Sequence, residues 1–416
     1  MNPGIPRMPR PSSTMPGEGI ATSAVLAHES ELQFELGGPA YRLMQRIGLI
    51  QGESRSIGRR VVAFLLITWV PLLLFSLLEE RALGPTPPES FLLDFATYAR
   101  FFLAIPLIFI AEAVAGEQIR EAGLRFVQAN LVRPEDLPVV EAAVVRSRQR
   151  REAIAPELIM VVVALLGGWF TVETWTRTEH AVSWNSITAP GVTGLSITGM
   201  WYHLVAVPIL QFFALRWLWR LAIWTMFLFR MSRLELNLVA THPDRAAGLG
   251  FLGDAHLSIA IFAVALSCIL SAQVAFELYF EGARIESYKV LLATYLVVVE
   301  IVCIGPLLMF APMLARTKRS GVLIYGLFAQ SYNREFEDKW VTGKTAATHS
   351  ALGSADIQAL ADLGASYDIV RQMKILPFNK GHILLIAIVS ALPGLPLVLL
   401  IMPVGEILKL LGKLIA

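Results

Sequence analysis

The chain has 416 residues, of which 55% are hydrophobic and only 16% are charged. Charged side chains usually make up about a quarter of a soluble domain, so this composition excludes an ordinary soluble protein. Several apolar runs are long enough for a helix to cross a bilayer core of about 30 Å, which takes roughly 20 residues. The formal net charge of +2 does not indicate a nucleic-acid partner, because the basic residues follow the expected topology and form no binding stripe.

Residues 1–57 are predicted to form a disordered N-terminal tail and a basic lead-in. The tail, up to Gly38, is rich in Pro, Ser, Gly and Glu, a composition typical of segments that cannot form a packed core. It contains no apolar stretch of the kind that a signal peptide needs. We therefore expect the first membrane helix, which stays in the mature protein, to target the chain.

Residues 58–315 are predicted to form a six-helix transmembrane core. The fourth apolar run is about 50 Å long at 1.5 Å per residue, so that helix must tilt or extend beyond the bilayer. The six predicted helices cover about 61–78, 91–115, 156–175, 197–229, 255–280 and 288–314.

The rest of the chain combines a polar segment with a last apolar run. Residues 316–381 form a cytosolic helical segment, in which one predicted helix extends the sixth run and another begins at Ser354, a good N-cap. Residues 382–416 contain a seventh apolar run, broken by prolines between Pro393 and Pro396, and an amphipathic C-terminal tail. Whether the seventh run spans the membrane or re-enters it stays open.

The distribution of Lys and Arg predicts how the helices are oriented. These residues are concentrated in the lead-in, after the second run, after the fourth run and in the segment 316–381. Cytoplasmic loops of membrane proteins carry such an excess, so we expect a cytoplasmic N-terminus. The predicted fold is an all-α integral membrane protein with about seven transmembrane helices and a small helical cytosolic layer.

Ionisable residues inside the predicted helices are candidates for function, because a charge at the bilayer centre is costly. Glu300 is expected about 18 Å down the sixth helix, and Arg100 about 13 Å down the second helix from the same side. The two depths permit a buried pair if these helices touch, and the pair would be either functional or purely structural. His203, about 9 Å down the fourth helix, could titrate near neutral pH or act as a hydrogen-bonded structural residue.

Other ionisable residues are interpreted as structural. Glu112, Glu157 and Glu277 lie near predicted helix ends, where water reaches them. Arg216 and Arg220 are one turn apart on one face, and their long side chains can reach the membrane interface.

The stretch from Thr241 to Asp254 lies between two long apolar runs and combines a Pro-Asp turn signal, a fixed positive charge and three glycines. Its Gly248, Gly250 and Gly253 match the dinucleotide fingerprint literally, but no strand precedes them, so we reject that function. Backbone N–H groups next to Arg245 could hold an anion such as a lipid headgroup phosphate. The alternative is a tight turn that lets two helices pack closely.

Catalytic and cofactor motifs are not evident elsewhere. His and Cys do not stand at metal-ligand spacing, and the Gly-Lys-Thr triplet that ends at Thr345 lacks the first glycine of a phosphate-binding loop. We therefore predict no catalytic residue, no metal and no cofactor.

The stretch from Thr241 to Gly253, the segment from Ser354 to Gly364 and the ending from Leu392 to Pro403 resemble a group of uncharacterised bacterial polytopic inner-membrane proteins. The resemblance implies a bacterial inner (plasma) membrane origin. The group has no established activity, so it implies no functional residues.

Three functions remain compatible with the sequence. The preferred one is a transport or channel-like protein with a buried Glu/Arg site within the membrane. The second is a scaffold or signalling subunit that binds a cytosolic partner through 316–381. The third is a lipid-headgroup-binding protein or enzyme at the Gly-rich stretch. A lipid bilayer is the expected environment, and a homo-oligomer is compatible with all three.

Overall fold

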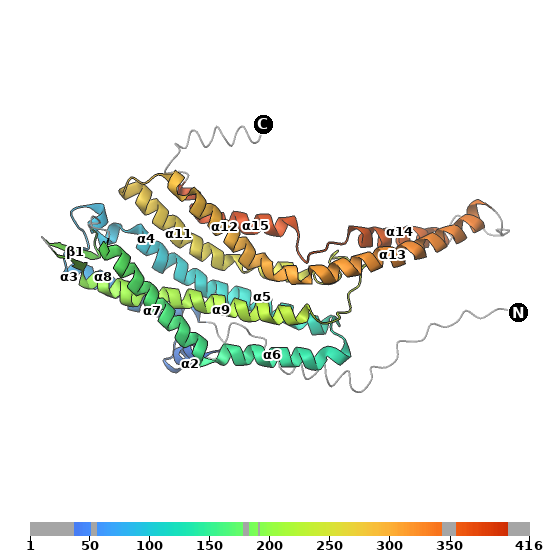
Figure 1. The fold of residues 1–416 in the computed structure, drawn as a ribbon, viewed down its shortest axis with the longest axis horizontal. Coiled ribbons are helices and arrows are strands. Elements are labelled where there is room, and N and C mark those ends of the chain that lie inside the picture. The colour runs from blue at the N-terminus through green and yellow to red at the C-terminus, as the bar shows by residue number, and fades with distance from the viewer. Residues whose placement is uncertain (1–36, 51–55, 178–182, 190–191, 343–354, 398–416) are drawn as a thin grey trace.

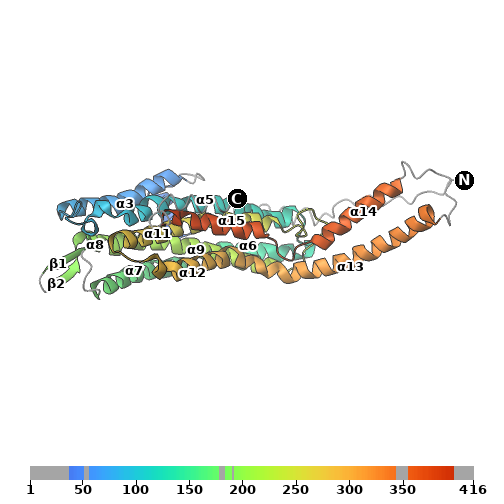
Figure 2. The same cartoon turned by 90° about the horizontal axis from the view of Figure 1, so that it is seen from above.

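The computed structural model describes residues 37–50, 56–177, 183–189, 192–342 and 355–397. This part of the chain forms an elongated bundle of helices with one small β-hairpin at one end and a two-helix arm at the other (Figures 1 and 2). We call these the hairpin end and the arm end. Six of its helical segments are long and apolar enough to cross a membrane, and a helix pair bent by 43°, Pro134–Glu152 with Ile154–Phe170, brings the number to seven if it is counted as one span. The predicted all-α integral membrane fold is confirmed.

The first half of the chain supplies the helices on one side of the bundle. A short helix near the N-terminus precedes the first spanning helix, and the hairpin β1–β2 pairs Ser186 with Leu195 in antiparallel register. In order, the elements are α2 (Pro39–Arg46), α3 (Ile57–Leu78), η2 (Pro87–Glu89), η3 (Phe91–Leu93), α4 (Phe95–Tyr98), η4 (Ala99–Ala104), α5 (Ile105–Gln128), η5 (Pro134–Asp136), α6 (Leu137–Glu152), α7 (Ile154–Arg177), β1 (Ser186–Ala189) and β2 (Val192–Leu195).

The second half begins with the fourth spanning helix and ends in the last apolar helix. In order, its elements are α8 (Ile197–Trp201), η6 (Tyr202–Ala206), α9 (Val207–Met231), α10 (Phe251–Leu257), α11 (Ala260–Phe280), η7 (Ile285–Tyr288), α12 (Lys289–Ile304), η8 (Gly305–Phe310), α13 (Ala311–Phe336), η9 (Glu337–Val341), α14 (Ala355–Gln372), α15 (Lys380–Ala391) and η10 (Leu392–Gly394). The C-terminal tail predicted after residue 402 lies outside the described residues.

Several helices are longer than the apolar runs that predicted them. Continuous helical segments cover Phe95–Gln128, Ile197–Met231 and Ile285–Val341. Apolar content marks only the part of a helix that lies in lipid, whereas the backbone hydrogen bonds continue into polar sequence. The N-terminal lead-in also contains a helix, α2, whose Tyr41 and Met44 are buried.

Two segments of π-helix interrupt spanning helices at equivalent places. Segment η4 ends two residues before Pro106, and η6 ends two residues before Pro208. Proline has no N–H to donate to the preceding turn, so the hydrogen-bonding register before it is free to widen. Each of these π segments carries a polar side chain within a helical segment long enough to span a membrane, Arg100 in η4 and His203 in η6.

Candidate functional site

Arg100 and His203 lie close together near the hairpin end. The Arg100 guanidinium donates a hydrogen bond to Oε1 of Gln273 on α11, and it lies 5.8 Å from the ring centre of Tyr202. Tyr202 precedes His203, which is buried. A Cβ atom on Gly168 would lie 2.2 Å from the His203 carbonyl oxygen, so α7 packs directly against η6 at a glycine. The structure therefore brings together two of the three predicted intramembrane residues.

A chain of hydrogen bonds leads from Arg100 towards the hairpin end. The Gln273 amide donates to Glu277 Oε1 over 2.7 Å, and the Tyr288 hydroxyl donates to the other carboxylate oxygen of Glu277. On the opposite side, the Trp184 ring packs on Tyr202 and its Nε1 donates to Asp94 over 3.0 Å. We call Asp94, Arg100, Tyr202, His203 and Gln273 the outer cluster.

Glu300 is not part of this cluster, and the predicted Glu300–Arg100 pair is wrong. Both oxygens of Glu300 are buried and have no hydrogen-bond partner among the described residues. Helix α11 packs against η4 and α5, and α12 packs mainly against α15 and η8. Helix α11 lies between the helical segments that carry the two residues.

A second cluster of charged residues is buried nearer the arm end. Arg60 on α3, Arg216 and Arg220 on α9 all donate to the carboxylate of Glu112 on α5, the last two over 3.0 and 2.6 Å. Each of these four side chains is no more than 9% exposed. A buried Glu/Arg site therefore exists, but Glu112, Arg216 and Arg220 are residues that the sequence suggested were structural, and Arg60 was placed in the basic lead-in.

The N-terminal segment closes this second cluster. The Gly37 carbonyl oxygen accepts hydrogen bonds from Arg216 and Arg220, both over 3.1 Å. The N–H of Ala40 donates to Glu157 over 2.7 Å, and Arg216 lies 3.5 Å from the same carboxylate. We call Arg60, Glu112, Glu157, Arg216 and Arg220 the inner cluster.

The approach of this segment requires glycine. Gly37 and Gly38 have φ angles of 103° and 89°, which side chains rarely adopt. A Cβ atom on Gly38 would lie 2.8 Å from Glu157 Oε1. These glycines fall in the polar tail, so composition alone gave no sign that they reach the bundle.

A layer of phenylalanine rings covers the inner cluster on the side of the hairpin end. Phe64, Phe109 and Phe213 pack against one another with ring centres 4.6 to 5.3 Å apart. The Arg60 guanidinium lies 4.0 Å from the centre of the Phe109 ring. Phe109 and Phe213 are each one helical turn from a charged residue of the inner cluster, Glu112 and Arg216.

The Gly-rich stretch binds an anion, but that anion is the carboxylate of Asp244. Its oxygens accept hydrogen bonds from the N–H groups of Ala246, Gly248 and Gly250 over 2.7 to 3.2 Å. The N–H of Gly253 donates to the Gly250 carbonyl. The predicted anion site at Gly248, Gly250 and Gly253 is therefore occupied from within, and the tight-turn alternative describes the stretch.

The remaining residues of this stretch fix it to the connection between α14 and α15. The Arg245 carbonyl accepts a hydrogen bond from the N–H of Lys374, while its side chain is exposed. A Cβ atom on Gly253 would lie 2.6 Å from the Pro377 carbonyl oxygen. A pocket of about 420 Å³ remains beside the stretch, with Asp244, Asp254 and basic residues in its wall.

Removing the Asp244 carboxylate is expected to destabilise the protein. Partial burial raises the pKa of Asp244, but hydrogen bonds from Ala246, Gly250 and Gly248 outweigh it, so the pKa is lower than usual. Its stabilising contribution is therefore present above pH 3.8, the ordinary value, and is lost as the pH falls through the lower folded-state pKa. Asp244→Ala should cost about 2 kcal/mol.

Thermal unfolding of detergent-solubilised protein measures this loss at neutral pH. Asp244→Asn keeps one acceptor oxygen and should melt between the wild type and Asp244→Ala. Equal melting temperatures for all three proteins would show that these hydrogen bonds contribute nothing.

Comparisons with protein-family models, curated proteins and solved structures find no match to this chain. Among the described residues, no three His, Cys, Asp or Glu side chains are grouped so that they could hold a metal ion. The chemistry of the two clusters is therefore the basis for assigning a function.

Proposed function

We propose that this protein transports an anionic solute across the membrane between the outer and the inner cluster. One observation carries the proposal. Two long helical segments, Phe95–Gln128 and Ile197–Met231, each contribute residues to a polar cluster on either side of a layer of aromatic rings. From Arg100 to Glu112 the helix advances about 18 Å, and from His203 to Arg216 about 20 Å. Polar sites stacked across a bilayer and separated by a closed apolar layer are what a gated path requires.

Arg100 and the inner cluster favour an anion, because the acid of the outer cluster, Asp94, is already bonded to Thr97 and Trp184. The hydrogen-bond acceptor of Arg100 is the neutral amide of Gln273, and Arg100 has no carboxylate within 4 Å among the described residues. The inner cluster contains three arginines and two glutamates. Arg100 is half-buried, and an arginine partly removed from water without a nearby countercharge is stabilised when an anion binds beside it.

The backbone near the outer cluster supplies a means of movement. Segments of π-helix are frequent at functional sites, because their wider hydrogen-bond register can shift at low cost. Both π segments precede a proline, and prolines in membrane helices allow bending. A change of register at Ala99–Ala104 would move Arg100 with respect to Gln273 and alter its contact with a bound anion.

We take the arm end as the cytoplasmic end in a bacterial inner membrane, because Lys and Arg are concentrated there. On this orientation the outer cluster faces the periplasmic half of the bilayer. Anions would enter past Tyr288 and Glu277, reach Arg100, and leave past the inner cluster into the cytoplasm.

Anion uptake into proteoliposomes tests the proposal. We expect the wild type to take up one of chloride, phosphate, sulfate or a small carboxylate, and Arg100→Gln to reduce that uptake by about tenfold or more. The matched control is Arg284→Gln, which removes an exposed arginine at the same end of the bundle and should leave uptake unchanged. The proposal fails if the wild type takes up none of the four anions, or if folded Arg100→Gln and Arg284→Gln behave alike.

A further inference from the structure

The arm is the part of the molecule that projects furthest from the bundle. It consists of residues 322–342 and 355–372, in which α13 and α14 lie side by side and antiparallel (Figures 1 and 2). Its base is fixed, because a Cβ atom on Gly321 would lie 2.7 Å from Ala240 and 3.0 Å from Val370. The bundle therefore holds the arm in a defined direction.

Beyond its base the arm has no core of its own. Within residues 322–342 and 355–369, every side chain is at least partly exposed. Helices in proteins are stabilised mainly by burying an apolar face against another element. The two helices of the arm therefore lack a buried apolar core. A third helix packed against them would supply one.

An apolar stripe runs along α13 on the arm. Leu323, Ile324, Leu327 and Phe328 are each between 57% and 63% exposed. They form two pairs spaced by four residues, so they lie on one side of the helix. Such spacing is how a helix presents an apolar face to another helix.

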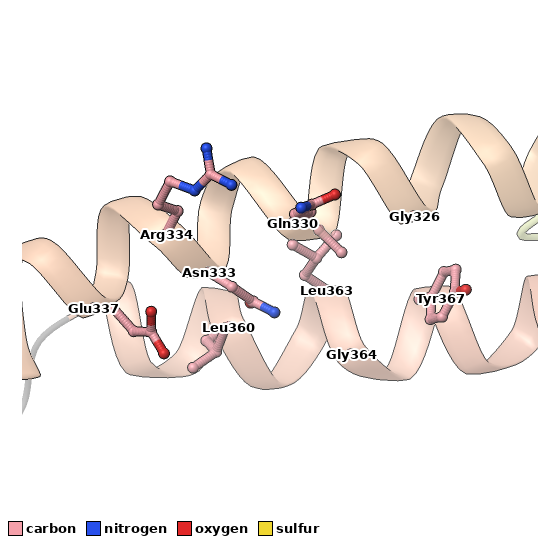
Figure 3. Close-up of a pocket in the computed structure, with 10 residues that line it drawn as sticks. Gly326, Gln330, Asn333, Arg334, Glu337, Leu360, Leu363, Gly364 and Tyr367 are labelled. Carbon is pink, nitrogen blue, oxygen red and sulfur yellow. The ribbon is translucent and has the colours of Figure 1, made fainter.

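A groove of about 610 Å³ lies between the two helices of the arm (Figure 3). Its α13 wall is polar, with Asn333, Arg334 and Glu337, and its α14 wall contains Leu360 and Leu363. A Cβ atom on Gly364 would have no neighbour within 4 Å, so the floor of the groove has room for an incoming side chain.

The charge of the arm selects between possible occupants. Its described residues include six acidic side chains, Glu335, Glu337, Asp338, Asp356, Asp362 and Asp368, and three basic ones, Arg334, Lys339 and Arg371; because Arg316, Lys318 and Arg319 lie just before the stripe, the excess of acid is in the outer part of the arm. An excess of acid opposes pairing with a second copy of the arm and opposes adsorption to anionic lipid. It favours a partner of positive charge.

We infer that the arm is a docking site for a basic amphipathic helix of a cytosolic protein. The apolar face of that helix covers the stripe of Leu323 to Phe328. Its Lys or Arg residues lie beside the acidic residues of the arm, and one side chain enters the groove. This inference depends on the cytoplasmic orientation of the arm but not on transport, so either can fail alone.

Binding of a synthetic peptide to the full-length protein tests the inference. The probe is a fluorescent amphipathic Leu/Lys helix, and its control has every Lys replaced by Glu; the protein is held in nanodiscs of zwitterionic lipid. We expect saturable binding of the Leu/Lys peptide, measured by anisotropy, and binding of the Leu/Glu peptide weaker by about tenfold or more.

Two matched variants separate apolar docking from simple charge attraction. Phe328→Glu adds a negative charge in the stripe, and Ser331→Glu adds the same charge to an exposed position on the same helix. If charge attraction were the whole cause, both variants would bind the Leu/Lys peptide at least as well as the wild type. Apolar docking instead predicts that Phe328→Glu loses about tenfold in affinity while Ser331→Glu does not.

Three results would overturn the inference. The wild type would fail to bind the Leu/Lys peptide, or Phe328→Glu would bind it as well as Ser331→Glu does. The third result is that something else covers the stripe. A disulfide between two copies of Leu327→Cys would show a second copy there, and quenching of a label on that cysteine by a lipid-borne quencher would show lipid.

Discussion

Glu112→Ala is expected to destabilise the protein by about 3–5 kcal/mol, the range found when one partner of a buried ion pair is removed. The Glu112 carboxylate is the shared acceptor of Arg60, Arg216 and Arg220, and all four side chains are almost fully buried. Without it, three guanidinium groups would remain in the bundle with only Glu157 as a nearby acid. Mutual repulsion and lost solvation would then both oppose folding.

Thermal unfolding in detergent, followed by size-exclusion chromatography, measures the effect. Glu300→Gln is the matched control, because it alters a carboxylate in the membrane that has no hydrogen-bond partner among the described residues. Adding Arg220→Gln to Glu112→Gln should restore part of the stability by removing one unpaired charge. A Glu112→Ala protein that melts like the Glu300→Gln protein would contradict a structural role for the inner cluster.

The sequence was sufficient to predict the spanning helices, because apolar length is a direct requirement of the bilayer. Arg100 and His203 fall within two of these helical segments, in η4 and η6. The sequence could not show which face of a helix meets which neighbour. Glu300 and Arg100 align in depth, yet α11 lies between them, whereas Glu112 and Arg216 meet because α5 packs directly on α9.

The Gly-rich stretch shows a second limit of prediction from sequence. Positive φ angles occur there at Arg245 (55°), Ala247 (54°) and Gly248 (94°), so only one of the three glycines marks a left-handed position. The Pro243-Asp244 turn signal indicates that Asp244 caps local N–H groups, and the structure confirms it, with the carboxylate accepting from three of them. A tethered carboxylate has a higher local concentration than any free anion, so it occupies the N–H groups first.

The inner cluster illustrates how a missed site could have been found. Arg216 and Arg220 stand one turn apart, and both would require a buried acceptor if their face of α9 turned inward rather than to the interface. Glu112 lies near the end of the second apolar run, as Arg216 and Arg220 lie near the end of the fourth, so it is an acid that could meet them. The sequence gives no comparable signal for Gly37, which accepts hydrogen bonds from Arg216 and Arg220 through its carbonyl oxygen. Every residue has such an oxygen, so none can be singled out.

Phe213→Ala is expected to open a leak between the two clusters. Its ring packs against Phe64 and Phe109 at 4.6 and 5.3 Å, and removing it leaves a cavity next to buried charges. Closed apolar constrictions exclude ions because water does not fill them, and a cavity beside Arg216 gives water polar partners. Passive anion leak should rise about tenfold, with a stability loss of about 3 kcal/mol.

Dye-based leak assays in proteoliposomes distinguish this opening from general damage. Leu218→Ala removes a side chain of α9 that is 39% exposed, away from the phenylalanine layer, and should not leak. Phe213→Leu refills most of the volume and should restore the barrier, since size rather than aromatic chemistry excludes water. If Phe213→Ala remains as tight as Leu218→Ala while losing stability, the rings are a structural core and the path between the clusters does not exist. If it leaks and Arg100→Gln suppresses that leak, the outer cluster and the aromatic layer belong to one path.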